Sequence, residues 1–359
     1  MKTLFQTTGR VINGVTHIGT WRESSMTKED KFYHHLVKTI TSGTRYNKHS
    51  LEKEGERFGI VDKTWVKELS ELALVSIGRR RIADTKGLKV TFDALVDLYN
   101  IQHNLSLRTS HSMMLQQYST PIPLAYLASK YVIDGKSNSR YFEPSAGNGL
   151  LTVAFPYNQT YVNELDSIRL SNLKRQPYKV VSNQDATLPF KKYYQYFDGI
   201  ATNPPFATLD EPIKAGGFLI KHLDHAMSIT ALDTMKDSGK AAIIVGGHSS
   251  YDAKGRLTRG KNRIFLNYLY HHYNVEDVIS INGKKLYTKQ GTGFDVRLIL
   301  INGRKVEPNG VAPLKNSQLT EVINSYEELY DRVGLRDIDI KKKLKLRAKA
   351  LIILQKQAL

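Results

Sequence analysis

The sequence has 359 residues, of which 41% are apolar and 24% charged, and these proportions are ordinary for a globular protein. Lys and Arg total 52 against 34 Asp and Glu, which gives a net charge of +18. This excess favours a polyanionic partner such as nucleic acid, although a cationic surface that only serves solubility is the alternative. Without cysteine, the chain forms neither a disulfide nor a cysteine zinc site.

The sequence carries no sign of a membrane protein. No apolar run approaches the roughly 20 residues that a bilayer-spanning helix needs. The opening stretch, MKTLFQTTGRVING, also lacks the apolar segment of a secretory signal. We therefore expect a soluble, cytoplasmic protein that makes no membrane contact.

Residues 1–115 are expected to form a basic helical region that could bind DNA. Asp62 has the side chain of a helix N-cap, and the apolar residues that follow it recur at helical spacing. A second helix is expected after Thr91. The three arginines at 79–81 lie near the end of the first helix, where they could contact phosphate or simply complement the helix dipole.

Residues 116–304 alternate short apolar runs with helical patterns, which predicts an α/β unit with a mostly parallel sheet covered by helices on both faces. One long helix is expected within residues 216–239. Residues 305–359 form a basic helical extension, whose segment KKKLKLRAKALIIL predicts a packed terminal helix or, alternatively, a nucleic-acid-binding arm. The predicted strands are Tyr141–Glu143, Thr160–Asn163, Lys179–Ser182, Phe197–Thr202, Ala241–Val245, Val278–Ile281 and Val296–Ile301.

The stretch EPSAGNG follows the first of these strands and is expected to open a helix. In a doubly wound sheet, ligands bind beyond the carboxyl ends of the strands, where such a turn lies. Gly147 and Gly149 have no side chains, so the backbone there could approach a ligand closely. The spacing differs from the dinucleotide fingerprint, and no lysine follows as in a phosphate-binding P-loop. A turn that only permits close packing is the alternative.

Acidic residues follow the next two predicted strands. Glu164 stands about twenty residues beyond the glycines, where a carboxylate can accept hydrogen bonds from both hydroxyls of a ribose. Asp166 competes for this role. Asp185, after the third strand, could accept a hydrogen bond from the amino group of an adenine ring. Each of these acids could instead be a solvated loop residue.

The segment TNPPF ends the fourth predicted strand. Its two prolines have fixed φ angles and donate no N–H, so the nearby carbonyl groups are held in set directions. The side-chain oxygen of Asn203 and the carbonyl of Pro204 could accept two hydrogen bonds from one exocyclic NH2 group. Phe206 offers a face on which a planar base can stack. An ordinary strand-ending turn is the alternative.

The order of QQYSTP (116–121), FEPSAGNG, NELD, QDA and TNPPF resembles that of the amino-methylating S-adenosylmethionine-dependent methyltransferases. More closely, it is similar to the gamma group of N6-adenine DNA methyltransferases. Modification subunits of type I restriction enzymes and methyltransferase-like domains of strawberry-notch-type phage and plasmid proteins share this order. The resemblance covers residues 116–303 and implies the Rossmann-like sheet of class I methyltransferases, with seven strands of which the last hairpin strand is antiparallel.

The resemblance also implies a role for each matching residue. Thr120 and Pro121 would contact the methionine part of S-adenosylmethionine. Glu164 would bind the ribose. Asp185 and Ala186 would bind the adenine. The loop around the methionine amino group comprises Glu143, Pro144, Ala146, Gly147 and Gly149. The catalytic tetrapeptide comprises Asn203, Pro204, Pro205 and Phe206.

The activity that the resemblance implies is methyl transfer from S-adenosylmethionine to N6 of an adenine flipped out of duplex DNA. Phe206 replaces a common Tyr, which keeps the stacking face and loses a hydroxyl. Open alternatives are an adenine of RNA, a glutamine side chain of a protein, and a non-catalytic DNA-binding module. Target recognition is expected from residues 1–115, a partner subunit or a second copy of the chain, and residues 252–263 could hold the DNA backbone. No metal is expected, because the pairs His34–His35 and His271–His272 are adjacent and point to different faces.

Overall fold

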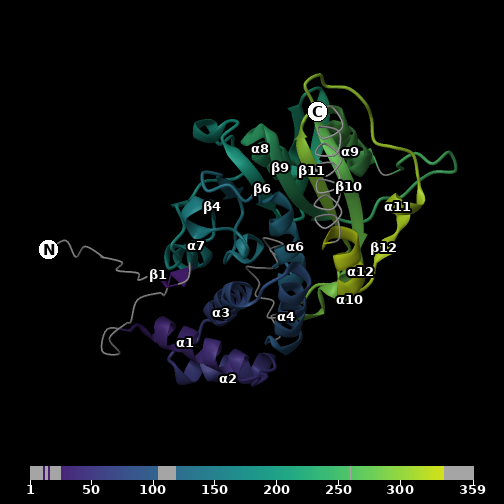
Figure 1. Ribbon diagram of the computed structural model, residues 1–359. Coiled ribbons are helices and arrows are strands. Elements are labelled where there is room, and N and C mark those ends of the chain that lie inside the picture. The colour runs from purple at the N-terminus through teal and green to yellow at the C-terminus, as the bar shows by residue number, and fades with distance from the viewer. Residues whose placement is uncertain (1–10, 13–14, 17–25, 104–118, 259, 335–359) are drawn as a thin grey trace, which may run out of the picture.

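The structure is a computed structural model that describes residues 11–12, 15–16, 26–103, 119–258 and 260–334. Within these residues an eight-stranded sheet forms the centre of the molecule, with helices on both faces (Figure 1). In order across the sheet, its strands are β12 (Val322–Ile323), β10 (Tyr273–Ile281), β11 (Val296–Arg304), β9 (Met235–Gly246), β6 (Phe197–Thr202), β3 (Tyr141–Glu143), β4 (Thr160–Asn163) and β5 (Val180–Ser182).

The sheet is mostly parallel. Strands β3, β4, β5, β6 and β9 run in one direction, whereas β11 runs antiparallel to both of its neighbours, β9 and β10. This confirms the predicted Rossmann-like sheet with its antiparallel hairpin strand, although the sheet has eight strands rather than the seven predicted, because the short strand β12 pairs with β10 at the edge. The chain builds outward from β3 to β5 and then returns to place β6 on the other side of β3. The order of the strands therefore reverses between β3 and β6, which is where doubly wound sheets bind their ligands.

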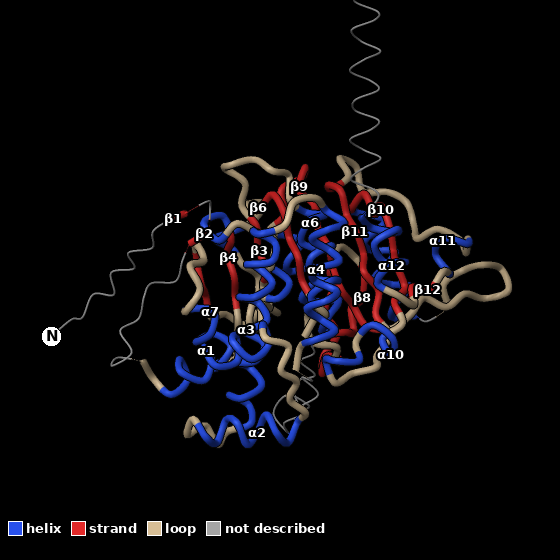
Figure 2. The backbone as a smooth tube through the Cα atoms, turned by 60° about the horizontal axis from the view of Figure 1, so that its bottom comes forward, coloured by secondary structure: helices blue, strands red, loops and turns tan. Residues whose placement is uncertain are grey.

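Successive side chains along the central strands point to opposite faces of the sheet, which explains why the molecule has a hydrophobic core on each face. Ile244 of β9 and Leu298 of β11 belong to one buried cluster, while their neighbours Ile243 and Ile299 belong to the other. Because both faces are covered, the central stretches of these strands, 241–245 of β9 and 298–301 of β11, are apolar throughout. On the first face α6 packs against β6 and β9, and α4 packs against α6 (Figure 2); α8 and α9 cover the second. These helices are α4 (Leu88–Ile101), α6 (Ile122–Val132), α8 (Leu223–Asp233) and α9 (Gly260–His272).

The N-terminal helices pack around α3 (Lys63–Asp84). Asp62 is its N-cap, as predicted, and accepts a hydrogen bond from the backbone N–H of Thr64 at 2.8 Å. The helix is buried over the whole stretch 66–75 rather than along one stripe. The reason is that it is surrounded by α1 (Lys28–Thr41), α2 (Lys48–Arg57), α4 and α7 (Ser167–Lys174).

Arg79, near the end of α3, has a structural role. Its guanidinium donates to the backbone carbonyls of Phe155 and Thr152, each at 2.8 Å, and lies over the ring of Tyr157. Arg80 is exposed. Neither predicted role, phosphate contact or interaction with the helix dipole, describes Arg79. Its side chain joins α3 to the turn after β3.

Two local predictions are wrong. The expected helix over 216–239 is interrupted: a hairpin of β7 (Thr208–Ala215) and β8 (Phe218–His222) precedes α8, and β9 follows it. Gly216 and Gly217 turn this hairpin with φ angles of 52° and 85°, which glycine adopts without strain. The turn EPSAGNG opens only a short 3-10 turn, Leu150–Thr152, instead of a helix.

Smaller elements complete the described part of the chain. No helix in it is long and apolar enough to cross a bilayer. The expected terminal helix from Lys341 and the first residues of QQYSTP, 116–118, lie outside the described residues. The remaining elements are β1 (Val11–Ile12), β2 (Val15–Thr16), α10 (Gly283–Leu286), α11 (Ser317–Thr320) and α12 (Tyr326–Leu329).

Candidate active site

A cleft of about 580 Å³ lies at the carboxyl ends of β3, β4, β5 and β6. Its volume falls within the roughly 300–1,000 Å³ that is usual for small-molecule sites. The structure thus brings together residues from five separate sequence motifs at the point where the strand order reverses. The predicted site residues that line the cleft are Thr120, Glu143, Pro144, Ala146, Gly147, Glu164, Asp185, Ala186, Asn203 and Pro205, whereas Pro121, Gly149, Pro204 and Phe206 do not.

The two glycines of the turn have different surroundings. At Gly147, with φ of 56°, an added Cβ would meet only Oε1 of Glu71, 3.9 Å away, so the backbone faces open space in the cleft. Gly149, with φ of 97°, lies against the protein: an added Cβ would stand 2.2 Å from Oη of Tyr178. Close approach to a ligand is therefore available at Gly147, and close packing explains Gly149.

The acid after β4 is built into this loop. The Glu164 side chain is buried, and its Oε2 accepts a hydrogen bond from the backbone N–H of Gly147 at 2.7 Å. Burial raises the pKa of Glu164, and the nearby Arg169 opposes that rise. Asp166 instead caps α7, accepting from the backbone N–H groups of Ile168 and Arg169 at 3.0 Å each. Of the two acids, Glu164 is the one whose carboxylate reaches the loop.

A second acid lies buried at the end of β3. Glu143 is 1% exposed and accepts a hydrogen bond from the backbone N–H of Asn203. Its Oε2 has no hydrogen-bond partner among the described residues. Burial raises the pKa of Glu143 well above its usual range, and the negative charge of Glu164 adds to the rise. A buried carboxyl group whose second oxygen accepts no hydrogen bond suits a ligand that carries hydrogen-bond donors or a positive charge.

Asn203 connects the end of β6 to the segment before α6. Its Nδ2 donates to Oγ1 of Thr120 at 2.9 Å. This orientation turns the amide oxygen, Oδ1, into the atom that can accept a hydrogen bond from an amine. Pro205 lines the cleft beside it, while Pro204 is buried. Asp185 is exposed at the other end of the cleft, where its carboxylate accepts from the backbone N–H of Thr187 at 2.9 Å.

Phe206 faces a second, adjacent pocket of about 270 Å³, and Ala207 lines both. Its ring lies against Gly246, where an added Cβ would come within 3.3 Å of Cγ. Asp224 accepts from the backbone N–H of Gly246 at 3.1 Å, and burial raises its pKa to about 6. Sequence reasoning missed this pocket, because α8 and α9 supply much of it and carry no motif. The other lining residues are Thr208, His222, His225, Gly247, Lys261 and Asn262.

Sequence reasoning also missed two acids of α3. Glu68 forms a buried ion pair with Arg169, 2.9 Å from Oε2 to Nε, and accepts from Nδ2 of Asn148 at 2.6 Å. Although burial opposes it, the charges of Arg169 and Lys67 hold the pKa of Glu68 at about 2. Glu71 lines the cleft and accepts a hydrogen bond from the hydroxyl of Ser119. The available signal was the pair of acids, three residues apart, within a helical run that is mostly apolar.

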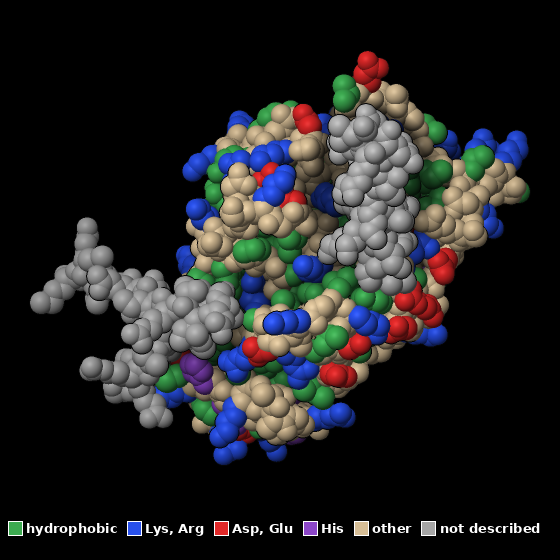
Figure 3. Space-filling model, in the orientation of Figure 1, with side chains coloured by type: hydrophobic (Ala, Val, Ile, Leu, Met, Phe, Trp, Pro, Cys, Tyr) green, Lys and Arg blue, Asp and Glu red, His purple; other side chains and the backbone are tan. Residues whose placement is uncertain are grey.

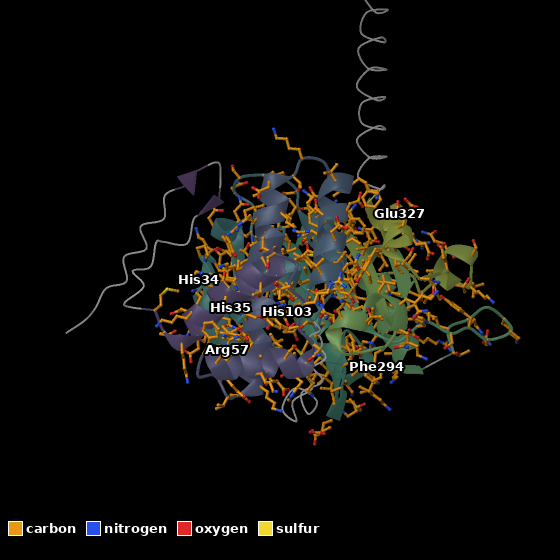
Figure 4. All side chains as sticks on the ribbon, turned by 90° about the horizontal axis from the view of Figure 1, so that it is seen from below. His34, His35, Arg57, His103, Phe294 and Glu327 are labelled. Carbon is orange, nitrogen blue, oxygen red and sulfur yellow. The ribbon has the colours of Figure 1, made fainter. Side chains whose placement is uncertain are left out.

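The histidine pairs lie elsewhere. Figure 4 shows His34 and His35 among the N-terminal helices, where Nε2 of His35 is 3.0 Å from Oε1 of Glu54. Across the described ranges, no three His, Cys, Asp or Glu side chains are grouped so that they could hold a metal ion. On the face drawn in Figure 3, Lys and Arg side chains occupy several separate places, both beside the sheet and over the N-terminal helices.

Comparisons with known proteins give one match in sequence and several in structure. No family model matches the chain. Over 249 residues it is 21% identical to the type II methyltransferase M.AccI of Acinetobacter calcoaceticus, a match that covers 62% of this chain and 44% of that protein. The chain therefore spans less than half the length of this curated relative.

Among solved structures, a putative class I S-adenosylmethionine-dependent methyltransferase from Listeria monocytogenes aligns with a TM-score of 0.48 at 14% identity, covering 86% of this chain and 97% of that one. A type I restriction-modification methyltransferase subunit from Streptococcus thermophilus aligns with a TM-score of 0.41 at 16% identity, covering 76% and 66%. In sequence the chain is similar to a type II methyltransferase, and its mostly parallel sheet with one antiparallel hairpin strand is the sheet that the resemblance to class I methyltransferases implies.

Proposed function

We propose that the chain transfers a methyl group from S-adenosylmethionine to N6 of adenine in DNA. One observation carries the proposal. Two cavities share the segment that follows β6: a cleft lined by Asn203 and Pro205, and a smaller pocket lined by Phe206, with Ala207 lining both. A methyl donor in the first and an amine in the second would meet beside this segment.

The charge of the cleft supports a cationic cofactor. Acidic side chains line it from end to end, among them Glu71, Glu143, Glu164 and Asp185, while the lining cation Arg169 is paired with Glu68. A phosphate group would be repelled there. S-adenosylmethionine carries a sulfonium and an ammonium group against one carboxylate, so its net charge is positive. It supplies, when bound, an electrophilic methyl group.

The positions of the residues fit the expected contacts. Glu164, held by the N–H of Gly147 at 2.7 Å, keeps further lone pairs with which to accept the ribose hydroxyls. Thr120 would contact the methionine part, whereas Pro121 is buried and does not line the cleft, and Ala186 with Asp185 would bind the adenine. Glu143, Pro144, Ala146 and Gly147 would line the bend around the amino acid. We assign Gly149 to the support of this bend, since its Cβ position is blocked by Tyr178.

The chemistry assigned to the tetrapeptide is hydrogen bonding and positioning. The amine of adenine is a weak nucleophile, because its lone pair is delocalised into the ring. Oδ1 of Asn203 and the carbonyl of Pro204 would accept its two N–H bonds and draw the nitrogen toward a tetrahedral geometry. Transfer to this nitrogen forms a C–N bond as the S–C bond breaks, and the nitrogen then loses a proton to solvent.

The second pocket would receive the flipped base. A cavity of roughly 150 Å³ is enough to bind benzene, so about 270 Å³ has room for a purine. Extruding the base costs a few kcal/mol, and stacking on Phe206 offsets roughly 1–3 kcal/mol of that cost. Near the pocket, Lys221, Lys261 and Arg263 are exposed and could hold the phosphate backbone.

DNA is the proposed partner because the net charge is +18. The chain would read its target sequence through its own N-terminal region, residues 1–115, through a partner subunit or as a homodimer. We take residues 116–304 as the catalytic unit of this proposal and residues 305–359 as a basic extension.

The test is transfer of a labelled methyl group from S-adenosylmethionine to duplex DNA, RNA or ribosomal protein. We expect label in DNA, as N6-methyladenine. Asn203→Ala should lower transfer by at least about 100-fold, the scale of losing an acceptor that acts in the transition state, while S-adenosylhomocysteine still binds. Label in RNA or in protein glutamine would identify the alternative substrates. DNA binding without any transfer would identify a non-catalytic module and refute the proposal.

A further inference from the structure

We propose that Glu71 of α3 binds the α-ammonium group of S-adenosylmethionine, so that the N-terminal helices complete the cofactor site. The inference rests on the proposed function and adds a binding residue from outside the segment that resembles methyltransferases. Among the described residues that line the cleft, Glu71 is the acid contributed by the N-terminal helices.

The geometry directs one oxygen of Glu71 into the cleft. Oε2 accepts the hydrogen bond from Ser119, the residue before Thr120. Oε1 lies 3.9 Å from the Cβ position of Gly147, whose N–H is bound to Glu164 on the side of the ribose. In space, the side chains of Glu71 and Glu164 are therefore separated by a single glycine, Gly147. In the cofactor, a short chain likewise separates the ribose from the amino-acid group.

The charges around Glu71 leave it in need of a cation. Its side chain is buried, and no described cation lies within ion-pair distance of it. The nearby cations, Arg169 and Lys67, contact Glu68 instead, at 2.9 Å and 3.6 Å. Burial, together with the negative charge of Glu68, raises the pKa of Glu71. A buried carboxylate without a cation is costly, and a bound ammonium group would relieve that cost.

The competing explanation is structural. Glu71 could serve only to hold Ser119 and thereby order the segment that leads into α6. In that case removing the carboxylate would weaken binding of any ligand equally. If Glu71 contacts the ammonium group, its removal should weaken only ligands that carry this group.

Isothermal titration of the full chain with S-adenosylhomocysteine and with its desamino analogue separates these explanations. We expect the native protein to prefer S-adenosylhomocysteine by about 10- to 100-fold, the scale of a hydrogen bond between charged groups. Glu71→Gln should lose most of this preference. Ser119→Ala is the matched control: it removes the hydrogen bond seen in the structure, keeps the charge of Glu71 and should retain the preference.

Each outcome has a distinct meaning. An undiminished preference in Glu71→Gln overturns the inference and leaves the proposed function intact. No binding of S-adenosylhomocysteine by the native protein overturns both. Should thermal unfolding show that Glu71→Gln does not fold, the double variant Glu71→Leu/Ser119→Ala replaces the buried pair with apolar side chains, an exchange that proteins often tolerate. It should lose the preference in the same way, and retention there also overturns the inference.

Discussion

Replacing Gly149 by alanine should destabilise the protein far more than the same change at Gly147. Both glycines have positive φ angles, 97° and 56°, so either alanine would cost about 1–2 kcal/mol of backbone strain. Only at residue 149 would the new methyl group also stand 2.2 Å from Oη of Tyr178. Such overpacking adds about 1–3 kcal/mol, which makes the expected total about 2–5 kcal/mol in the free energy of unfolding.

Urea denaturation in two backgrounds tests the cause. Tyr178→Phe removes Oη, along with its 2.7 Å hydrogen bond to Thr152, at a cost of about 1 kcal/mol. In that background the nearest ring atom to the new methyl group is Cζ, at 3.4 Å. Gly149→Ala should then cost only the strain of about 1–2 kcal/mol. An equal cost in both backgrounds would refute the steric explanation.

The same pair of variants separates ligand contact from packing. A methyl group on residue 147 enters the cleft, so Gly147→Ala should weaken binding of S-adenosylhomocysteine although the protein remains well folded. The folded fraction of Gly149→Ala should bind almost normally, since its methyl group points away from the cleft. The opposite result would mean that the ligand approaches the other glycine.

Two further predictions concern pH. Arg169 and Lys67 outweigh burial and lower the pKa of Glu68 from 4.5 to about 2. Glu68 therefore stabilises the fold above pH 4.5, and this contribution of about 3 kcal/mol is lost as the pH falls toward 2. In urea denaturation at a series of pH values, the free energy of unfolding should fall less steeply with acid for Glu68→Gln than for the native protein. Burial raises the pKa of Glu143, so binding of the cationic cofactor should release a proton and strengthen as the pH rises. Calorimetry in buffers of different ionisation enthalpy measures this proton release. The matched control is Glu143→Gln, which should bind the cofactor without releasing a proton.

The sequence was sufficient to predict the sheet because its signals are local. The strands β3 and β6 are short, largely apolar runs that are closely followed by residues with restricted backbones, Pro144 and Pro204. The failure over 216–239 has a local cause as well: the helical spacing of apolar residues continued through a hairpin, and the glycine pair at 216–217 was the stronger signal. The reversal of strand order that creates the cleft follows from the same alternation of strands and helices.

The contacts within the cleft could not be predicted, because they join distant segments. Ser119 and Glu71 are 48 residues apart, and Asn203 and Thr120 are 83 apart. No spacing rule relates such pairs. Phe206 is half-buried, and the pocket that it lines depends on α8 and α9, whose residues there follow no recognisable pattern.

The buried ion pair of Glu68 and Arg169 connects the N-terminal helices to the sheet. It joins α3 to α7, and Asn148 in the turn after β3 donates to the same carboxylate. Separating the N-terminal helices from the sheet while Arg169 stays buried would leave its charge unpaired, a change that typically costs about 3–5 kcal/mol. Helix α3 is therefore part of the wall of the cleft, and the N-terminal helices are not a unit independent of the sheet. Under the proposed function, we expect further contacts to a nucleic acid beside the second pocket, where the β7–β8 hairpin presents the exposed Lys214 and Lys221.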